Sequence, residues 1–288
     1  MKIAFFGTPA FAAESLKSLF EAGFDISAVI TAPDKPAGRG QKLQMSDVKK
    51  TALDLGLFIL QPEKLKSTDF IEQFKKLNVD LGVVIAFRML PEVIWSAPKL
   101  GTVNLHASLL PDYRGAAPIN HAIINGETQT GVSTFFLKHE IDTGDIIQRD
   151  SIEITQTENA TSLHDKLMIL GAKTIVSTVK TIEQFRDKTP ASAQIMSENP
   201  KLAPKIFRDF CELQTTLNST DFYNKVRGLS YYPGAWIKSP WGDLKLLVCQ
   251  LLSESIFQNI QNQNHLSLGD SFYIISKRLF VKTADSYI

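Results

Sequence analysis

The chain has 288 residues, of which 44% are hydrophobic and 21% are charged, and its formal net charge is +1. This composition is typical of a globular protein long enough for two domains, and it argues against an intrinsically disordered chain. The low net charge excludes a uniformly basic nucleic-acid-binding protein, so any site for a polyanion must be a local patch.

Cysteine spacing and apolar runs bear on location. Cys211 and Cys249 lie far apart without metal-ligand spacing, so we expect reduced thiols and no metal site. The apolar run at 3–6 is too short for the core of a signal peptide, and no run approaches the length of a membrane span. We therefore expect a cytoplasmic protein and, since nothing marks a dimer surface, a monomer.

Residues 1–187 alternate short apolar runs with helical stripes. The run at 2–6, helical spacing at 12–23 and a second run at 26–31 predict a βαβ unit. Because Gly7-Thr8-Pro9 lacks the dinucleotide-binding glycine pattern, a dinucleotide site is disfavoured. Further strands are predicted at 57–60, 81–86, 100–106, 132–137 and 146–154, with helices at 48–55, 70–77, 119–124 and from Ser162, where Ser162 and Asp165 form a predicted capping pair. The pattern predicts a Rossmann-like, mostly parallel sheet with helices on both faces.

A basic loop follows the second predicted strand. Residues 32–43 contain two prolines, two glycines and three cations, and we expect neither helix nor strand there. Between Thr31 and Lys50, five Lys or Arg residues face two Asp residues. Two interpretations stay open at this point: a solvated surface loop, or an arm that grips phosphates.

The last third of the chain changes character. Residues 188–205, punctuated by Pro190, Pro200 and Pro204, are predicted to link a domain at 1–187 to one at 206–288. Beyond the linker, a short helix at 222–229 and strands at 234–237, 243–249, 271–275 and 278–283 predict a small C-terminal β-barrel. Residues 201–288 carry ten Lys or Arg against seven Asp or Glu, which weakly favours contact with an RNA backbone.

Three polar residues stand out within the predicted strands and turns of residues 103–142. Asn104 and His106 are two apart in an apolar strand, so both side chains project from one face. Asp142 follows the predicted strand at 132–137 and reaches His106 if the two strands are neighbours. An amide, an imidazole and a carboxylate together can stabilise an oxyanion and transfer a proton. The alternative is a structural, hydrogen-bonded histidine, which is the commoner role for a lone His in a strand.

The surrounding motif resembles a known family. Asn104-x-His106-x-Ser108-Leu109-Leu110-Pro111, Arg114-Gly115 and Asp142-Thr143-Gly144-Asp145 are similar to the signature of the folate-dependent formyltransferases. The resemblance extends over most of the chain and is strongest to the members that act on methionyl-tRNA. It implies transfer of the formyl group of 10-formyltetrahydrofolate to the α-amino group of methionyl-tRNA, without a metal, with catalytic residues Asn104, His106 and Asp142.

The resemblance also implies two binding sites. The folate site would be lined by Ser108, Leu109, Leu110, Pro111, Phe87, Met89 and Ile141. The basic loop would enter the acceptor stem of the tRNA, with Arg39 and Lys42 on phosphates. The chain departs from the family at Phe87-Arg88, where an aromatic residue and glycine are usual, and at Tyr231, where proline is usual. It also ends at Ile288, where family members usually run on.

Two other functions remain open on the sequence. One is another folate-dependent formyltransferase that acts on a small amine such as glycinamide ribonucleotide, although a small substrate needs neither the basic loop nor the C-terminal domain. The other is a non-catalytic RNA-binding protein on a Rossmann scaffold, which would not need Asn104, His106 and Asp142 together.

Overall fold

The computed structural model describes residues 1–288 except 38–41, 197, 254, 257, 259–265, 268–271 and 276–277, with backbone alone for 37, 42, 266–267, 272–275 and 278. The chain divides into two compact units whose ranges interleave. The first comprises Met1–Arg114, Gly131–Ile152 and His164–Lys201, and the second comprises Gly115–Thr130, Glu153–Leu163 and Leu202–Ile288. The division into domains at 1–187 and 206–288 with a linker at 188–205 stays a prediction.

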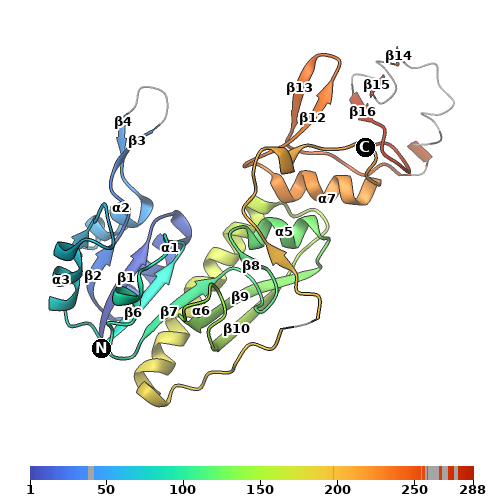
Figure 1. The fold of residues 1–288 in the computed structure, drawn as a ribbon. Coiled ribbons are helices and arrows are strands. Elements are labelled where there is room, and N and C mark those ends of the chain that lie inside the picture. The colour runs from blue at the N-terminus through green and yellow to red at the C-terminus, as the bar shows by residue number, and fades with distance from the viewer. Residues whose placement is uncertain are drawn as a thin grey trace. The chain divides into compact units, whose positions relative to one another are not determined.

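The first unit is built on a seven-stranded sheet in the order β10-β9-β7-β6-β1-β2-β5 (Figure 1). Five strands from β5 to β7 are parallel, and β9 runs antiparallel to β7, which confirms a mostly parallel sheet. The strands are β1 (Lys2–Gly7), β2 (Asp25–Ile30), β5 (Ile59–Leu60), β6 (Leu81–Ile85), β7 (Thr102–His106), β9 (Gln129–Phe136) and β10 (Ile146–Glu153).

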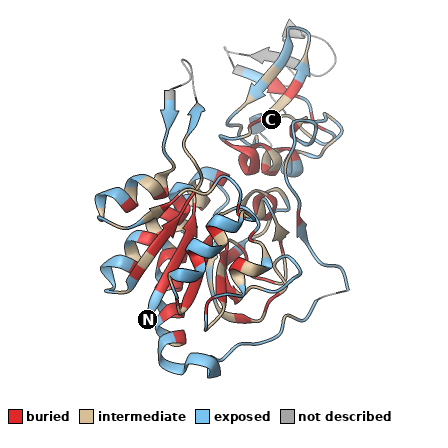
Figure 2. Ribbon diagram, turned by 60° about the vertical axis from the view of Figure 1, so that its left-hand side comes forward, coloured by how far each residue is buried: buried red, intermediate tan, exposed pale blue. Residues whose placement is uncertain are grey.

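Helices cover both faces of this sheet. They are α1 (Ala10–Glu21), α2 (Asp47–Asp54), α3 (Thr68–Lys76), α4 (Glu92–Trp95) and α6 (Ala160–Phe185). Phe70 and Phe74 of α3 and Ile94 of α4 pack against one face of β1, β2 and β6. On the other face, Gly171 lets α6 approach Leu105 of β7 so closely that a Cβ at position 171 would lie 2.8 Å from the Leu105 side chain. The central strands are therefore almost wholly buried, as the red segments of Figure 2 show.

The second unit has a core of its own. Phe222, Val226 and Leu229 of α7 (Ser219–Leu229) pack with Ala235 and Ile237. Its other elements are α5 (Pro118–Ile124), the strands β12 (Ala235–Ser239), β13 (Gly242–Leu246), β14 (Leu266–Ser267), β15 (Phe272–Ile275) and β16 (Arg278–Val281), and short pieces at β11 (Leu202–Ala203) and η2 (Asp209–Cys211). The two-residue strand β8 (Arg114–Gly115) falls at the boundary, with Arg114 in the first unit and Gly115 in the second. The described strands form a β12–β13 hairpin and a β14–β16 sheet, and their closure into a barrel stays a prediction.

Two local predictions are wrong. Residues 32–43 do contain strands: β3 (Lys35–Ala37) and β4 (Lys42–Gln44) pair antiparallel. The helix predicted from Ser162 begins at Ala160. Asn159 and Ser162 form the reciprocal cap: the Ser162 amide donates to Asn159 Oδ1 at 3.0 Å, and the Asn159 amide donates to Ser162 Oγ at 3.1 Å.

Two features are absent from the described residues. No helix within them combines the length and the apolar character required to cross a lipid bilayer. Three or more His, Cys, Asp or Glu side chains nowhere converge, within that same part of the chain, as a group able to hold a metal ion.

Candidate active site

The carboxyl ends of the parallel strands bring the candidate residues to one edge of the sheet. The register pairs Gly7 of β1 with Ile85 of β6, and Ile85 with Leu105 of β7, so His106 lies at the same edge as the segment that follows Ile85. Open α/β sheets place their ligands at this edge. The segment after β6 and the end of β7 therefore lie at the same edge of the sheet.

Asn104 and His106 project from one face of β7. Asn104 is paired in register with Val84 of β6, whose side chain belongs to the core under α3 and α4. Alternation along the strand directs Leu105 to the opposite face, against α6. Asn104 is half-buried, whereas His106 is only 7% exposed. The predicted side-by-side placement of the amide and the imidazole follows from this register.

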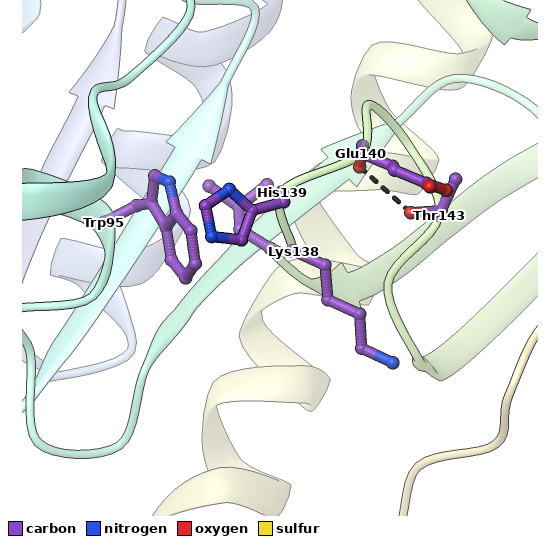
Figure 3. A pocket seen from close by; sticks show the side chains of 6 residues that line it. Trp95, Lys138, His139, Glu140 and Thr143 are labelled. Carbon is purple, nitrogen blue, oxygen red and sulfur yellow. Dashed lines mark hydrogen bonds between the residues drawn. The ribbon is translucent and has the colours of Figure 1, made fainter.

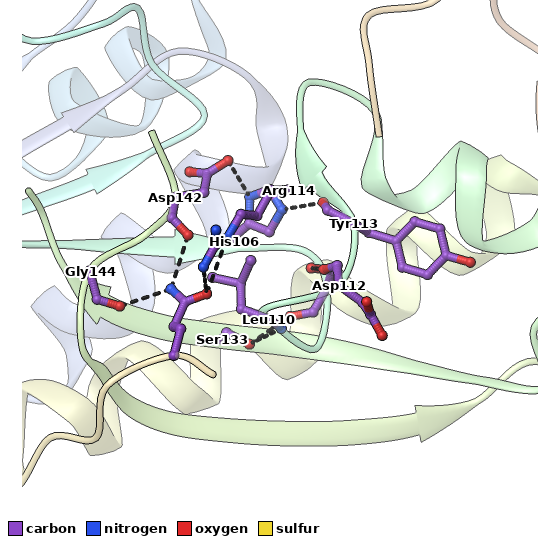
Figure 4. A network of polar contacts seen from close by, with 10 residues as sticks. His106, Leu110, Asp112, Tyr113, Arg114, Ser133, Asp142 and Gly144 are labelled. Carbon is purple, nitrogen blue, oxygen red and sulfur yellow. Dashed lines mark hydrogen bonds and ion pairs between the residues drawn. The ribbon is translucent and has the colours of Figure 1, made fainter. Parts of the chain in front are cut away.

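His106 makes two polar contacts, one from each ring nitrogen (Figure 4). Nε2 lies 2.9 Å from the carbonyl oxygen of Tyr113, which can only accept, so Nε2 carries the proton. Nδ1 lies 3.8 Å from Oδ2 of Asp142. The neutral ring therefore presents its lone pair at Nδ1, on the Asp142 side, and protonation there forms an ion pair with the carboxylate.

The loop between β9 and β10 brings Asp142 back to His106. Since β9 is antiparallel to β7, it ends with Phe136 beside Val103 rather than beside His106. Residues 137–145 make the return, and Asp142 adopts a left-handed backbone conformation with φ of 55°. Gly144 lies against β9 so tightly that a Cβ there would overlap the carbonyl oxygen of Phe136. The position of Asp142 thus depends on a turn that excludes a side chain two residues later.

The Ser108–Pro111 segment is fixed by its own hydrogen bonds. Ser108 Oγ donates to the carbonyl of Asp112 at 2.7 Å, while Ser133 Oγ donates to the Ser108 carbonyl at 2.7 Å and accepts from the Leu110 amide at 3.0 Å. Ser108 and Leu110 are 0% and 1% exposed. Leu109 and Pro111 are partly exposed. Of the four residues, only Leu109 and Pro111 present appreciable surface to solvent.

The segment after β6 carries one partly buried and one exposed apolar side chain, Phe87 and Met89. Phe87 packs on Phe6, with ring centroids 5.9 Å apart, and Met89 is 74% exposed. The guanidinium of Arg88 lies over the Phe87 ring, 5.6 Å from its centroid, and donates to the backbone carbonyls of Glu63, at 2.7 Å, and Pro62. Arg88 is thereby bound both to the loop after β5 and to its neighbour Phe87.

A shallow pocket of about 430 Å³ lies along the loop that carries Asp142 (Figure 3). It is lined by Trp95, Leu137, Lys138, His139, Glu140 and Thr143. His139 stands edge-on to Trp95 at 5.7 Å between ring centroids, and its Nε2 lies 2.9 Å from Glu92 Oε1. Ile141, in the same loop, is 63% exposed. The loop therefore combines a fixed carboxylate with apolar surface beside it.

Comparison with known proteins places this geometry in a family. The family model for formyl transferases matches residues 1–179. Methionyl-tRNA formyltransferase of Bacteroides thetaiotaomicron is 51% identical over 100% of this chain and 89% of its own, and that of Bacteroides fragilis is 52% identical over 82% and 73%. The chain belongs to the methionyl-tRNA formyltransferase family.

Solved structures of other formyltransferases share the fold of this family member. The N-formyltransferase of Helicobacter canadensis, solved with folinic acid and dTDP-3-aminofucose, has a TM-score of 0.67 at 18% identity and covers 100% of this chain and 97% of its own. Phosphoribosylglycinamide formyltransferase of Bacillus halodurans has a TM-score of 0.55 at 18% identity and covers 66% of this chain and 99% of its own. At these identities the likeness concerns the fold alone.

The basic loop of this formyltransferase family member, residues 32–43, is held by contacts of Asp34 near its start. Lys49 Nζ lies 2.6 Å from Asp34 Oδ2, and Gln61 Nε2 donates to Asp34 Oδ1 at 2.9 Å. These contacts, with the bond from Lys49 the stronger influence, hold the pKa of Asp34 below its ordinary value. Arg39 lies outside the described residues, and Lys42 is described by its backbone alone. The roles predicted for these two cations remain predictions.

Three residues of the site have no place in the predicted set. Tyr113 supplies the acceptor for His106, and Arg114 donates to Oε1 of Gln194 from Nη2 at 2.6 Å and from Nε at 3.2 Å. Gln194 falls in the segment predicted to be only a linker. Arg114 stood in the sequence motif and could have been considered for this role, whereas Gln194 carries no pattern that would distinguish it from other polar residues of 188–205.

Proposed function

We propose that this protein transfers the formyl group of 10-formyltetrahydrofolate to the α-amino group of initiator methionyl-tRNA. The observation that carries the proposal is the approach of His106 Nδ1 to Asp142 Oδ2, at 3.8 Å, in a chain about half identical to methionyl-tRNA formyltransferases over its full length. The fold, the candidate catalytic residues and the family membership all agree with formyl transfer.

The reaction requires a neutral amine, a stabilised oxyanion and removal of one proton. The methionyl nitrogen attacks the formyl carbon, and the Asn104 amide donates to the developing oxyanion. His106 accepts the proton that the nitrogen loses, at Nδ1, because Nε2 already donates to Tyr113. Asp142 stabilises the imidazolium, and the bond from the formyl carbon to the folate nitrogen breaks as that nitrogen takes up a proton. Formylmethionyl-tRNA and tetrahydrofolate are the products.

The folate would bind against exposed and partly exposed side chains that border the carboxyl edge of the sheet. Phe87 and Met89 follow β6, Ile141 precedes Asp142, and Leu109 and Pro111 follow His106. Ser108 and Leu110 complete the set of seven, and their burial limits them to backbone contacts and to support of the loop. Apolar surface with a few fixed polar groups is the usual composition of a cofactor-sized site.

The tRNA would be held by two parts of the chain. Arg39, which falls between β3 and β4 in the sequence, and Lys42, the first residue of β4, would contact phosphates of the acceptor stem. The C-terminal domain at 206–288, as a small β-barrel, would provide the second contact. We place the reaction in the cytoplasm, where charged tRNA is found, and expect the protein to act as a monomer.

One assay separates this proposal from its nearest alternative. Radiolabelled 10-formyltetrahydrofolate is supplied with either methionyl-tRNA or glycinamide ribonucleotide, and the labelled product is counted. We expect label in methionyl-tRNA alone. Label in glycinamide ribonucleotide would favour the small-amine enzyme, and label in neither, with retained tRNA binding, would favour a non-catalytic RNA-binding protein.

A further inference from the structure

We propose that Gln194 is a positioning residue for Asp142, with Arg114 as the group that orients it. The inference deepens the proposed function and rests on it, because it assigns a role in formyl transfer to a residue outside the motif. Gln194 lies in the segment at 188–205, and its side-chain amide contacts both Arg114 and the loop that carries Asp142.

The contacts fix the direction of the Gln194 amide. Arg114 has only donors, so the oxygen of the amide must face the guanidinium, which it does at 2.6 Å from Nη2. The amide nitrogen then faces two carbonyl oxygens, those of Asp142 at 2.9 Å and Gly144 at 2.8 Å. Both N–H groups find an acceptor, and reversing the amide would break every one of these bonds.

The two carbonyls lie in the part of the loop that most needs support. Asp142 has a left-handed backbone, which is uncommon for a residue other than glycine and persists when neighbouring contacts hold it. Gly144 allows no side chain, so the turn gains no packing of its own at that position. The amide nitrogen of Gln194 therefore holds the turn on both sides of Thr143.

The segment that carries Gln194 is itself attached to the sheet. Ser192 and Ile146 exchange both backbone hydrogen bonds, at 2.8 and 2.9 Å, immediately after the Asp142 loop ends. Further along, the Lys201 carbonyl accepts from the Tyr113 amide at 2.6 Å, and Tyr113 in turn accepts from His106. The segment thus supports the partners of His106 on both sides: Asp142 through Gln194, and Tyr113 through Lys201.

The test compares Gln194→Leu and Gln194→Glu with the parent chain and with Gln148→Leu. Gln148 is a matched control, because it is a half-buried glutamine of the same unit whose amide donates to Asp150 Oδ2 at 2.8 Å, away from the site. Gln194→Glu keeps an acceptor for Arg114 but replaces the donor to the two carbonyls by an acceptor. A residue that merely fastened the segment to Arg114 would tolerate this change.

We expect kcat to fall about 10- to 100-fold in both Gln194 variants, as misplacement of a reacting group does, while KM for each substrate stays within about twofold. The thermal midpoint should change no more than in Gln148→Leu, whose kcat should match the parent. A parental kcat in Gln194→Glu overturns the inference, as does a raised KM with unchanged kcat.

Hydrogen exchange of the amides at 143–145 gives a second readout that requires no substrate. Exchange there should be faster in both Gln194 variants than in the parent and unchanged in Gln148→Leu, and equal rates in all four proteins overturn the inference. A parent chain that transfers no formyl group refutes the proposed function, and the exchange rates still decide whether Gln194 holds the turn.

Discussion

Two loops of the first unit, each expected to contact a substrate, are held in different ways. The loop after His106 is bonded along its length: Ser108 donates within the loop, Ser133 bonds it to β9, and Tyr113 links it to Lys201. The β3–β4 hairpin is held at its base, by Asp34 with Lys49 and Gln61, and by the register of three residue pairs. Proton transfer needs fixed geometry, whereas contact with phosphates needs charge and reach.

The largest effect is expected from the candidate catalytic residues beside the more rigidly held loop. Asn104→Ala and His106→Ala should each lower kcat about 100- to 1,000-fold, because each removes one group that stabilises or deprotonates the transition state. Single-turnover formyl transfer to methionyl-tRNA measures the effect. His164→Ala, which removes a histidine bonded to Asp165 on α6, is the matched control. Turnover near that of the parent in either site variant would contradict the catalytic assignment.

A smaller effect is expected from the cations of the hairpin. Changing Arg39 and Lys42 together to alanine should weaken tRNA binding and lower the slope of log K against log salt by about 0.9 for each phosphate that is no longer neutralised. Affinity for folate should not change. Filter binding across a salt series measures the slope, with the exposed Lys75→Ala on α3 as the control. A slope equal to that of the parent would leave the hairpin without a role in binding phosphates.

The smallest effect is expected at the base of the hairpin. Asp34→Asn keeps an oxygen for Gln61 but loses the ion pair with Lys49, and we expect KM for methionyl-tRNA to rise about twofold, as for other partly exposed pairs. Because the pKa of Asp34 is lowered in the folded protein, its ion pair stabilises the fold above the ordinary aspartate pKa. That stabilisation is lost as the pH falls through the lowered value.

Thermal unfolding as a function of pH tests the sign. The parent should unfold at a higher temperature than Asp34→Asn at neutral pH, and the difference should vanish once Asp34 is protonated in both states. Asp54→Asn, at an exposed position of α2, is the control and should differ from the parent less than Asp34→Asn does at neutral pH. A difference between parent and Asp34→Asn that grows on acidification would show that another group is responsible.

The sheet could be predicted from the sequence because its strands are continuous apolar runs. Buried parallel strands such as β1 and β6 need apolar residues on both faces. The segments between the strands have apolar residues at helical spacing, which distinguishes them from the strands. The β3–β4 hairpin could not be predicted, because its two three-residue strands pair only with each other and show no alternation of apolar and polar residues. The predicted start of α6 was two residues too late, because the side chain of Asn159, rather than that of Ser162, accepts the hydrogen bond from a backbone amide of the first turn.

The candidate site was only partly predictable for a different reason. Asn104 and His106 stand out as polar residues in an apolar strand, and Asp142 follows the neighbouring strand. Their supports do not stand out: Tyr113 acts through its backbone, and Gln194 is one polar residue in a segment rich in proline. The burial of Ser108 and Leu110 also could not be predicted, because a motif shows which residues occur together and not which of them are exposed to solvent.

Arg88 joins two loops that are 25 residues apart in sequence. Its guanidinium binds the carbonyls of Pro62 and Glu63, and its neighbour Phe87 packs on Phe6. A glycine at this position would lack the hydrogen bonds between the two loops, whereas the arginine links them into a single structural module. A chimaera that imports the segment after β6 from a relative with glycine should therefore import residues 62–63 as well, since neither half of the module is complete alone.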